Sequence, residues 1–188
     1  MTFKLIATGI ASILLTGCVA LSTPELEQSW QGRFSLIARS ASQQENHSGR
    51  FTLTQANTDL TILDLKSALG NTLARITQTP TEVSLETLGN PTVYANDAES
   101  LLLKSLGFSV PVDGLNYWID GKVIPNQAAS TIPSAPPYNQ VKQSGWLITY
   151  ENYDESGLPK RIRLTREATS FAPSISILLV VSSRDHDS

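Results

Sequence analysis

Most of the chain alternates apolar and polar residues with a period of two, which is typical of strands that bury only one face. Short groups of turn-forming residues, such as Gly70-Asn71 and Gly89-Asn90-Pro91, separate the alternating segments. The polar residues 40–48 predict a turn after the first strand. In the first half of the chain the pattern predicts a meander of antiparallel strands over residues 33–38, 50–55, 59–65, 72–77 and 82–88.

The spacing of apolar residues becomes helical in the middle of the chain. Asn96 at the N-cap and Glu99 three residues later form a capping-box arrangement, and Gly107 ends the leucine-rich helix that follows. A second helix is predicted over residues 112–119. Residues 122–138 contain four prolines among small residues and therefore predict a loop.

Strands resume in the last third of the chain, over residues 146–150, 161–165 and 175–181. Because the last of these is apolar on both faces apart from Ser176, we expect it deep in the sheet or under a lid. A long antiparallel sheet curls, and helices can cover its concave face. The predicted fold class is α+β and mainly β: one domain over residues 30–183 forms an unclosed antiparallel β-barrel with a short helical lid around an apolar pocket, and a polar tail follows at 184–188.

The N-terminus resembles the signal of an exported bacterial lipoprotein. Lys4 precedes the apolar run 5–15, which has the length of a secretory signal and is too short to span a bilayer, since spanning takes about 20 residues. The run ends in Leu15-Thr16-Gly17-Cys18, which resembles a lipobox. This resemblance implies a signal peptide at residues 1–17, lipidation of Cys18 and a lipidated tether over residues 18–29. An ordinary signal peptide with an incidental cysteine is the alternative.

Composition narrows the possible functions. The 188 residues include 14 Lys+Arg and 17 Asp+Glu, and the net charge of −3 argues against nucleic-acid binding, which needs a basic surface. One cysteine and two histidines exclude an intrachain disulfide and a Cys/His zinc site of the usual ligand count. The sequence contains neither a Gly-x-Ser-x-Gly elbow nor a phosphate-binding glycine loop. With His47 in a predicted turn and His186 in the polar tail, we expect no catalytic residue, no metal and no cofactor.

One predicted turn has an apolar tip. Leu69 lies between Ala68 and Gly70, where the strand over residues 59–65 gives way to the strand over residues 72–77. Two interpretations follow from the pattern alone. Either the strand continues and Leu69 packs inward, or Leu69 is exposed and reaches into lipid, where full burial of its side chain gains ~1.5–3 kcal/mol.

Nearly all of the chain after Cys18 carries a series of short sequence motifs, which follow one another in a fixed order. They are Trp30-Gln31-Gly32-Arg33-Phe34-Ser35-Leu36, Gly49-Arg50-Phe51, Ala68-Leu69-Gly70, Tyr94-Ala95-Asn96-Asp97-Ala98-Glu99, Leu115-Asn116-Tyr117-Trp118-Ile119-Asp120-Gly121, Gly145-Trp146 and Leu158-Pro159. With the lipobox, they resemble the LolB family of outer-membrane lipoprotein-localisation factors. Two features depart from the family pattern: Ala68 stands where a proline is common, and the C-terminal strand lacks the usual terminal tryptophan.

The resemblance implies an unclosed antiparallel β-barrel with a helical lid around a hydrophobic cavity. It implies a non-enzymatic protein that accepts acylated lipoproteins from the periplasmic carrier LolA and inserts them into the outer membrane. The lipid on Cys18 would anchor it at the periplasmic face of the outer membrane, where we expect a monomer. In the family a protruding loop carries an exposed leucine, and the matching position here is Leu69, flanked by Ala68 and Gly70.

Strand alternation and helix spacing predict which side chains would line a cavity for acyl chains. On the strands the candidates are Phe34, Leu36, Phe51, Leu53, Leu63, Leu65, Trp146, Ile148 and Ile162. Under the lid they are Leu101, Leu102, Leu106, Leu115 and Trp118. The alternative is that these side chains form only a packed core, since any apolar strand face is core by default.

Three other functions stay open at this point. A lipid-binding or lipid-sensing envelope lipoprotein could use the same fold. An envelope enzyme, such as a lipid hydrolase, would need a nucleophile and a base together in the pocket. A structural lipoprotein of a larger envelope complex would bury its apolar strands in a partner and have no cavity.

Overall fold

The computed structural model describes residues 28–57 and 59–186. Its strands form one antiparallel sheet of eleven strands in the order β6-β5-β4-β3-β2-β1-β11-β10-β9-β8-β7. The strands are β1 (Gln28–Arg39), β2 (Gln44–Asn57), β3 (Leu60–Lys66), β4 (Thr72–Gln78), β5 (Val83–Thr87), β6 (Val93–Ala95), β7 (Ala129–Ile132), β8 (Gln140–Gln143), β9 (Trp146–Tyr153), β10 (Pro159–Arg166) and β11 (Ser174–His186). Because β6 and β7 lie at opposite edges and do not pair, the barrel stays open.

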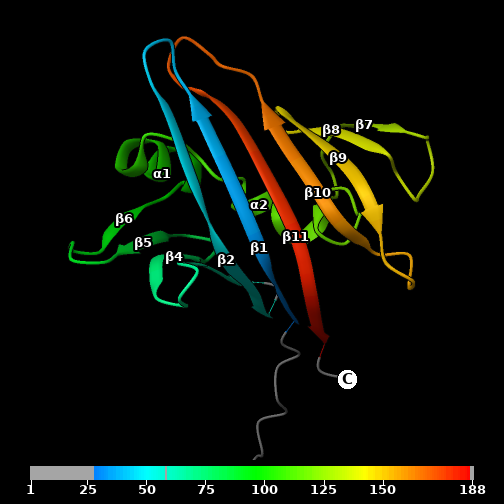
Figure 1. Cartoon of the computed structure of the whole chain (residues 1–188), viewed down its shortest axis with the longest axis horizontal. Helices are drawn as coiled ribbons and strands as arrows, with labels where there is room; N and C mark the ends of the chain where they lie inside the picture. Colours follow the sequence, from blue (N-terminus) through cyan, green and yellow to red (C-terminus); the bar gives the residue numbers. More distant parts are fainter. Residues whose placement is uncertain (1–27, 58, 187–188) are drawn as a thin grey trace, which may run out of the picture.

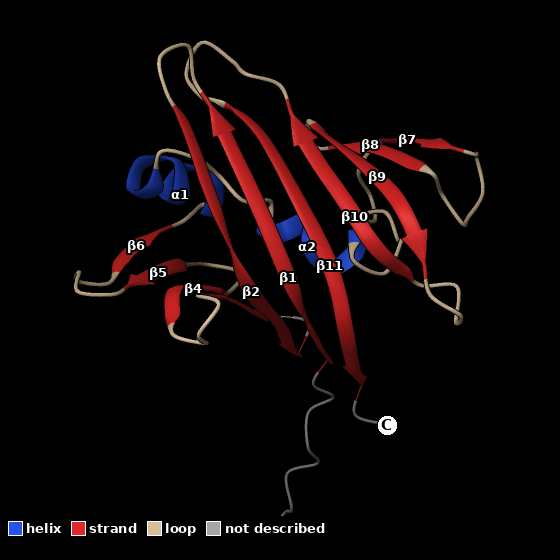
Figure 2. Cartoon of the chain, viewed as in Figure 1, coloured by secondary structure: helices blue, strands red, loops and turns tan. Residues whose placement is uncertain are grey.

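Two short helices, α1 (Ala98–Leu106) and α2 (Val112–Trp118), lie on one face of the sheet. In Figure 1 they are behind the long strands β1, β2 and β11, and Figure 2 separates them by colour from the strands that they cover. This arrangement confirms the predicted fold class, an unclosed antiparallel barrel with a helical lid. None of the helices in the described part of the chain is long and apolar enough to cross a membrane.

The long strands at the centre place the core. In β1, Phe34, Leu36 and Ala38 alternate with exposed or half-exposed residues and point toward the helices. Only glycine fits at position 32, where the Phe51 ring and the Val180 backbone pack closely against β1. A Cβ there would come within 2.7 Å of the Phe51 ring and 2.2 Å of the carbonyl oxygen of Val180. The buried side chains of β1, β2, β3 and β11 therefore meet in one cluster under the lid.

The last strand extends further toward the C-terminus than the sequence predicts. The prediction of a polar tail at 184–188 is wrong for residues 184–186, because β11 continues to His186. There it pairs with Gln28, the first residue of β1. The reason is the Arg184 side chain, which hydrogen-bonds to Asp120 and to the backbone oxygen of Ile119. Gln28 and Ser29, the last residues of the expected tether, also belong to β1, because they pair with residues of β11.

Several polar segments expected to be loops are strands. The turn predicted over residues 40–48 is confined to 40–43, closed by a 2.9 Å hydrogen bond from Ser40 N–H to the Gln43 carbonyl. His47 therefore lies in β2 and His186 in β11, not in a turn and a tail. The loop predicted over residues 122–138 contains β7, a short edge strand. These segments lack apolar alternation because both of their faces meet solvent.

The lid begins one residue later than predicted. Asp97, not Asn96, is the N-cap of α1, and its carboxylate accepts a 2.7 Å hydrogen bond from the Ser100 N–H. Gly107 ends the helix as expected, in the left-handed region at φ 79°. In α2, Gly114 leaves room for the Trp118 ring, which a Cβ at this position would meet at 2.3 Å.

Candidate functional site

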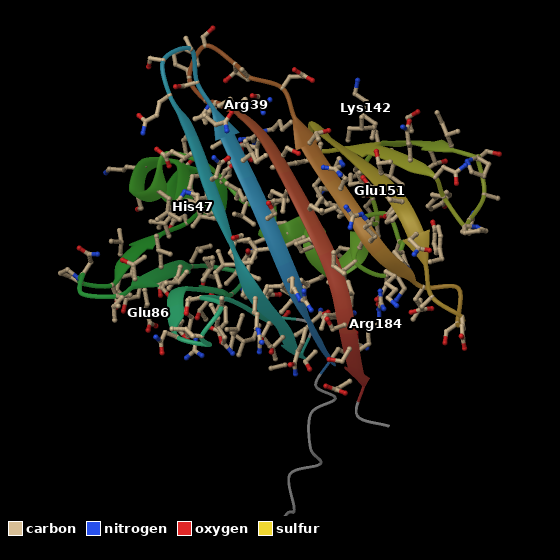
Figure 3. The ribbon with its side chains drawn as sticks, viewed as in Figure 1. Arg39, His47, Glu86, Lys142, Glu151 and Arg184 are labelled. Atoms are coloured by element: carbon tan, nitrogen blue, oxygen red, sulfur yellow. The ribbon has the colours of Figure 1, made fainter. Side chains whose placement is uncertain are left out.

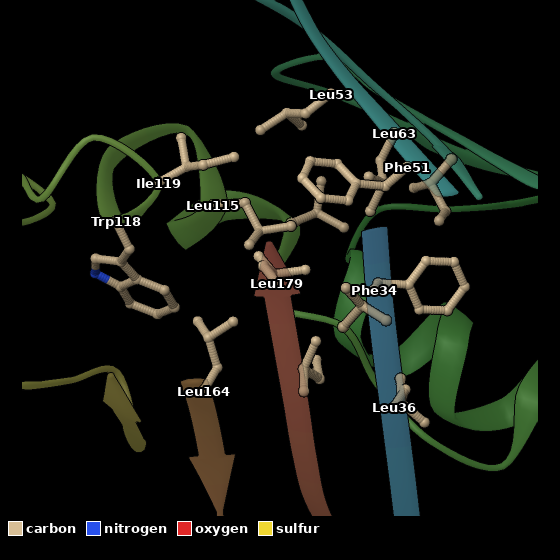
Figure 4. Close-up of a cluster of buried hydrophobic side chains, with 14 of the residues drawn as sticks. Phe34, Leu36, Phe51, Leu53, Leu63, Leu115, Trp118, Ile119, Leu164 and Leu179 are labelled. Atoms are coloured by element: carbon tan, nitrogen blue, oxygen red, sulfur yellow. The ribbon is translucent and has the colours of Figure 1, made fainter. Parts of the chain in front are cut away.

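An apolar pocket lies between the sheet and the lid. All of its lining side chains are hydrocarbon or aromatic, and they come from β1, β2, β3, β11, α2 and the segments that flank α2. They are Phe34, Leu36, Phe51, Leu53, Leu63, Leu65, Val110, Leu115, Ile119, Ile177 and Leu179. Figure 4 shows how Leu115 and Ile119 face the strands that carry Leu53 and Leu179. A site of this composition offers no hydrogen bonds and suits hydrocarbon.

The structure brings half of the predicted lining residues to the apolar pocket and places the other half elsewhere in the core. Those that line it are Phe34, Leu36, Phe51, Leu53, Leu63, Leu65 and Leu115. The others pack in the core without lining it: Leu101, Leu102, Leu106, Trp118, Trp146, Ile148 and Ile162. The sequence reasoning missed Val110, Ile119, Ile177 and Leu179. Alternation along residues 175–181 could have identified Ile177 and Leu179.

The pocket is small in this conformation. Its volume is about 20 Å³, and a cavity needs about 10–15 Å³ to hold one water molecule. An acyl chain of many carbons therefore has no room unless the lining side chains and the lid move apart. The structure describes a closed state of an apolar compartment.

A buried amide attaches the second helix to the sheet. Gln143 of β8 is only 2% exposed. Its Oε1 accepts hydrogen bonds from the Trp118 Nε1–H at 3.0 Å and from the Ile124 N–H at 2.9 Å. Its Nε2 donates to the Ile124 carbonyl at 2.9 Å. Gln143 therefore attaches the end of α2 and the segment after it to β8, and Asn116 of α2 adds a 2.7 Å hydrogen bond from its Nδ2 to the Thr61 hydroxyl of β3.

The first helix is attached by an arginine from β10. Arg166 donates a 2.6 Å hydrogen bond to the hydroxyl of Ser109, in the segment between α1 and α2, and forms an ion pair with Glu99 of α1. Its guanidinium lies 4.9 Å from the centroid of the Trp146 ring, a cation–π contact. Polar contacts therefore attach both helices to the sheet, and these contacts have to break before the lid can move.

The expected lipid-contact loop is a tight turn with its leucine in solvent. In residues 67–71, which we call the Leu69 turn, the Ser67 N–H donates to the Asn71 carbonyl at 2.8 Å and the Gly70 N–H donates to the Ser67 carbonyl at 3.0 Å. Gly70 has φ 92°, a conformation that favours glycine. Leu69 is 91% exposed at the tip, so the interpretation in which it packs inward is wrong.

A second turn repeats this arrangement, and the sequence reasoning missed it. Leu69-Gly70-Asn71 recurs as Leu88-Gly89-Asn90 between β5 and β6 (Figure 1), with Leu88 80% exposed and Gly89 at φ 79°. Because Ala74 of β4 pairs with Thr87 of β5, the two turns lie at the same end of these strands. A groove of about 350 Å³, lined by Leu73 and Leu88 among others, borders the second turn. The repeated tripeptide was the available signal.

No titratable side chain in the described part of the chain lines the apolar pocket. His47 lies on the exposed part of β2 (Figure 3), with Nε2 3.4 Å from the Glu45 carboxylate and its ring 5.1 Å from that of Phe108. Burial raises the pKa of Tyr150, whose hydroxyl has no hydrogen-bond partner in the described part of the chain. Within residues 28–57 and 59–186, no group of three or more His, Cys, Asp or Glu side chains could hold a metal ion.

Comparison with known proteins decides the family. The family model described as "Outer membrane lipoprotein LolB" matches residues 27–183, which is nearly the whole described domain. The chain belongs to the LolB family. A relative named outer-membrane lipoprotein LolB from Cupriavidus necator is 29% identical over 185 residues, 93% of this chain and 92% of its own length. A relative of the same name from Thiobacillus denitrificans is 35% identical over 103 residues, 54% of this chain and 55% of its own.

Among solved structures, the chain is similar to a LolA superfamily protein from Nitrosomonas europaea, with a TM-score of 0.48, 11% identity and coverage of 84% of this chain and 85% of that one. The assignment to the LolB family rests on the family model and not on this superposition. The predicted lipidation site of this LolB family member, Cys18, lies outside the described residues.

Proposed function

We propose that this LolB family protein accepts acylated lipoproteins from the periplasmic carrier LolA and inserts them into the outer membrane. The observation that carries the proposal is a compartment lined by apolar side chains alone, under a helical lid. The protein works as a monomer and performs no covalent chemistry. Lipid on Cys18 keeps it at the periplasmic face of the outer membrane.

Acceptance requires the closed compartment to open. An arriving acyl chain displaces the lid from the strands that carry Phe34, Phe51 and Leu179, and then occupies the space between them. Each buried methylene gains about 0.8 kcal/mol, so a long chain can offset the lost contacts between lid and sheet. Transfer runs downhill without a nucleotide, since a tenfold preference for the acceptor needs only about 1.4 kcal/mol.

Release occurs where the protein meets the bilayer. The exposed side chain of Leu69 inserts into the lipid surface, and Leu88 on the neighbouring turn supports the same contact. Full burial of each leucine gains ~1.5–3 kcal/mol, which holds the domain against the membrane during release. The bilayer then takes up the acyl chains because it buries them more completely than the compartment does.

The test is transfer of a labelled lipoprotein from purified carrier to the purified protein and onward to vesicles. Leu69→Glu leaves acceptance unchanged and lowers delivery to vesicles at least about tenfold, because a carboxylate cannot enter lipid and the leucine's burial is lost. The matched control is Leu147→Glu, at a half-exposed leucine on β9, which delivers normally.

Two outcomes contradict the proposal. Normal delivery by Leu69→Glu removes the membrane role of the turn. Failure of the unaltered protein to accept the lipoprotein removes the transfer function, and free phospholipid co-purifying in its place, detected by mass spectrometry, would favour a lipid-sensing lipoprotein.

A further inference from the structure

Three basic side chains form a row across the outer face of the sheet. Arg33 of β1 pairs in register with Arg50 of β2, and Arg50 pairs in register with Lys66 of β3. Arg33 and Arg50 are exposed and alternate with buried Phe34 and Phe51, so they lie on the face opposite the apolar pocket. We call Arg33, Arg50 and Lys66 the cation row.

Repulsion within the cation row lowers the stability of the sheet. Like charges directly opposite each other on neighbouring strands repel and destabilise a sheet. In the described part of the chain, neither Arg33 nor Arg50 forms an ion pair or a side-chain hydrogen bond. Lys66 has partners: its Nζ lies 4.0 Å from Asp64 Oδ2 and donates to the Thr52 hydroxyl at 3.4 Å. Asp64 also accepts two hydrogen bonds from Arg75, at 2.7 and 2.8 Å. Two exposed arginines beside a lysine form a local site of positive charge, which an anionic ligand would stabilise.

The cation row lines a groove that reaches the Leu69 turn. It has a volume of about 470 Å³ and is lined by Gln31, Gly32, Arg33, Arg50, Phe51, Thr52, Lys66, Gly70, Ser182 and Ser183. The two serines lie where the pairing of β1 with β11 shifts register between Gln31 and Gly32, and both are exposed. Their hydroxyls add hydrogen-bond donors to the positive charge of the row.

We propose that this groove binds the phosphate of an anionic phospholipid headgroup at the membrane surface. Guanidinium groups suit this role because their planar donors can bind two phosphate oxygens at once. The inference rests on the proposed function in one respect: it takes the Leu69 turn to be the part of the protein that meets the bilayer.

The position of the groove favours a phospholipid, and not a free anion, as the ligand. Gly70 lines the groove and directly follows Leu69, whose side chain is 91% exposed. When Leu69 inserts among acyl chains, the groove beside Gly70 lies level with the headgroups. Apolar insertion and phosphate binding then act together on one lipid surface, as two signals do in other peripheral membrane proteins.

The experiment uses the full chain in neutral detergent micelles, into which phosphatidylglycerol is mixed at increasing mole fraction. The side-chain Nε–H resonances of Arg33 and Arg50 should shift and saturate. Those of Arg161 and Arg163 should not move, because both arginines are engaged by Glu151 at 2.6 Å. The double variant Arg33→Gln/Arg50→Gln should weaken lipid binding roughly thirtyfold, read from the Gly70 amide, since each basic residue near an anionic surface contributes about fivefold. The double variant Arg161→Gln/Arg163→Gln removes the same charge and should bind as the unaltered chain does.

A parallel titration with inorganic phosphate separates the two sources of the anion. A saturable shift only with phosphatidylglycerol supports the headgroup site. Equal shifts with inorganic phosphate mean an adventitious ion only, and absence of any shift, or equal weakening by both double variants, overturns the site. The lipoprotein transfer assay is independent of this titration. Failure of the unaltered protein to accept the lipoprotein, together with saturable binding of phosphatidylglycerol, would overturn the proposed function and leave the headgroup site standing.

Discussion

At the scale of single residues, Arg184 connects three parts of the molecule. Its Nε donates to Asp120 Oδ1 at 3.3 Å, its Nη1 lies 3.3 Å from Asp154 Oδ2, and its Nη2 donates to the Ile119 carbonyl at 3.2 Å. Asp120 is also the acceptor for the Trp30 indole N–H at 2.8 Å. The carboxylate of Asp120 is therefore held between β1, β11 and the end of α2, with a side chain only 6% exposed.

We expect Arg184→Ala to lower the free energy of unfolding by about 3 kcal/mol, because it leaves the buried carboxylate of Asp120 without its closest cation. Urea unfolding of the purified protein measures this loss. Asp185→Ala is the control, since this exposed neighbour has no ion pair in the described structure and should change stability by less than about 0.5 kcal/mol. Equal, small effects of both substitutions would show that the end of β11 is dispensable.

Residue patterns alone could identify Leu69 but not Arg184. An isolated leucine before a glycine in a turn is visible in the sequence, and the same signal was present at Leu88. Arg184, by contrast, lies among serines and acidic residues and looks like part of a tail. Its partners Asp120 and Asp154 are 64 and 30 positions away, so only the three-dimensional arrangement reveals its role.

At the scale of elements, the N-cap of α1 sets where the lid begins. Asp97→Ala should reduce stability by about 1 kcal/mol because the Ser100 N–H loses its acceptor. Asp97→Asn should retain most of the stability of the unaltered protein, since asparagine caps helices about as well as aspartate. Thermal or urea unfolding of the three proteins distinguishes a cap from a residue that merely happens to precede the helix.

The charge of Asp97 gives this cap a pH dependence. Hydrogen bonding from Ser100 lowers the pKa of Asp97 below its ordinary value of 3.8. The stabilisation by the ionised form is therefore complete above pH 3.8 and is lost as the pH falls through the folded-state pKa. The stability difference between the unaltered protein and Asp97→Ala should narrow in that range. A difference that stays constant down to strong acid would contradict a charged cap.

Element boundaries were predictable where one face of the strand is buried. The apolar alternation of β3 and β4 was predicted within about a residue of the observed ends. Residues 44–48 of β2 and the edge strand β7 are largely exposed on both faces, and their backbone pairing with neighbouring strands, not side-chain burial, makes them strands. The N-cap was misplaced because Asn96 and Asp97 are both good caps, and local sequence could not choose between them.

At the scale of the whole molecule, the mechanism needs both a closed apolar compartment and a lid that can open. The volume of about 20 Å³ leaves little room for water when no acyl chain is present, and the apolar lining offers a water molecule no hydrogen bond. Gln143, Arg166 and Asn116 attach the helices and the segments beside them through polar contacts, which have to break when the lid opens. The strands β1, β2 and β11, paired along their length, provide a rigid wall against which the lid moves.

Loading with an acylated lipoprotein should therefore loosen the lid and leave the wall unchanged. We expect faster amide hydrogen exchange in α2 and in the segment around Ser109 on loading, because the acyl chain displaces Val110, Leu115 and Ile119 from the strands. Amides of β1 should exchange as slowly as before. The same cargo without acyl chains is the control and should change neither region. Slower exchange throughout the lid on loading would mean that the chains bind elsewhere, since a compartment of this size cannot take them while it stays closed.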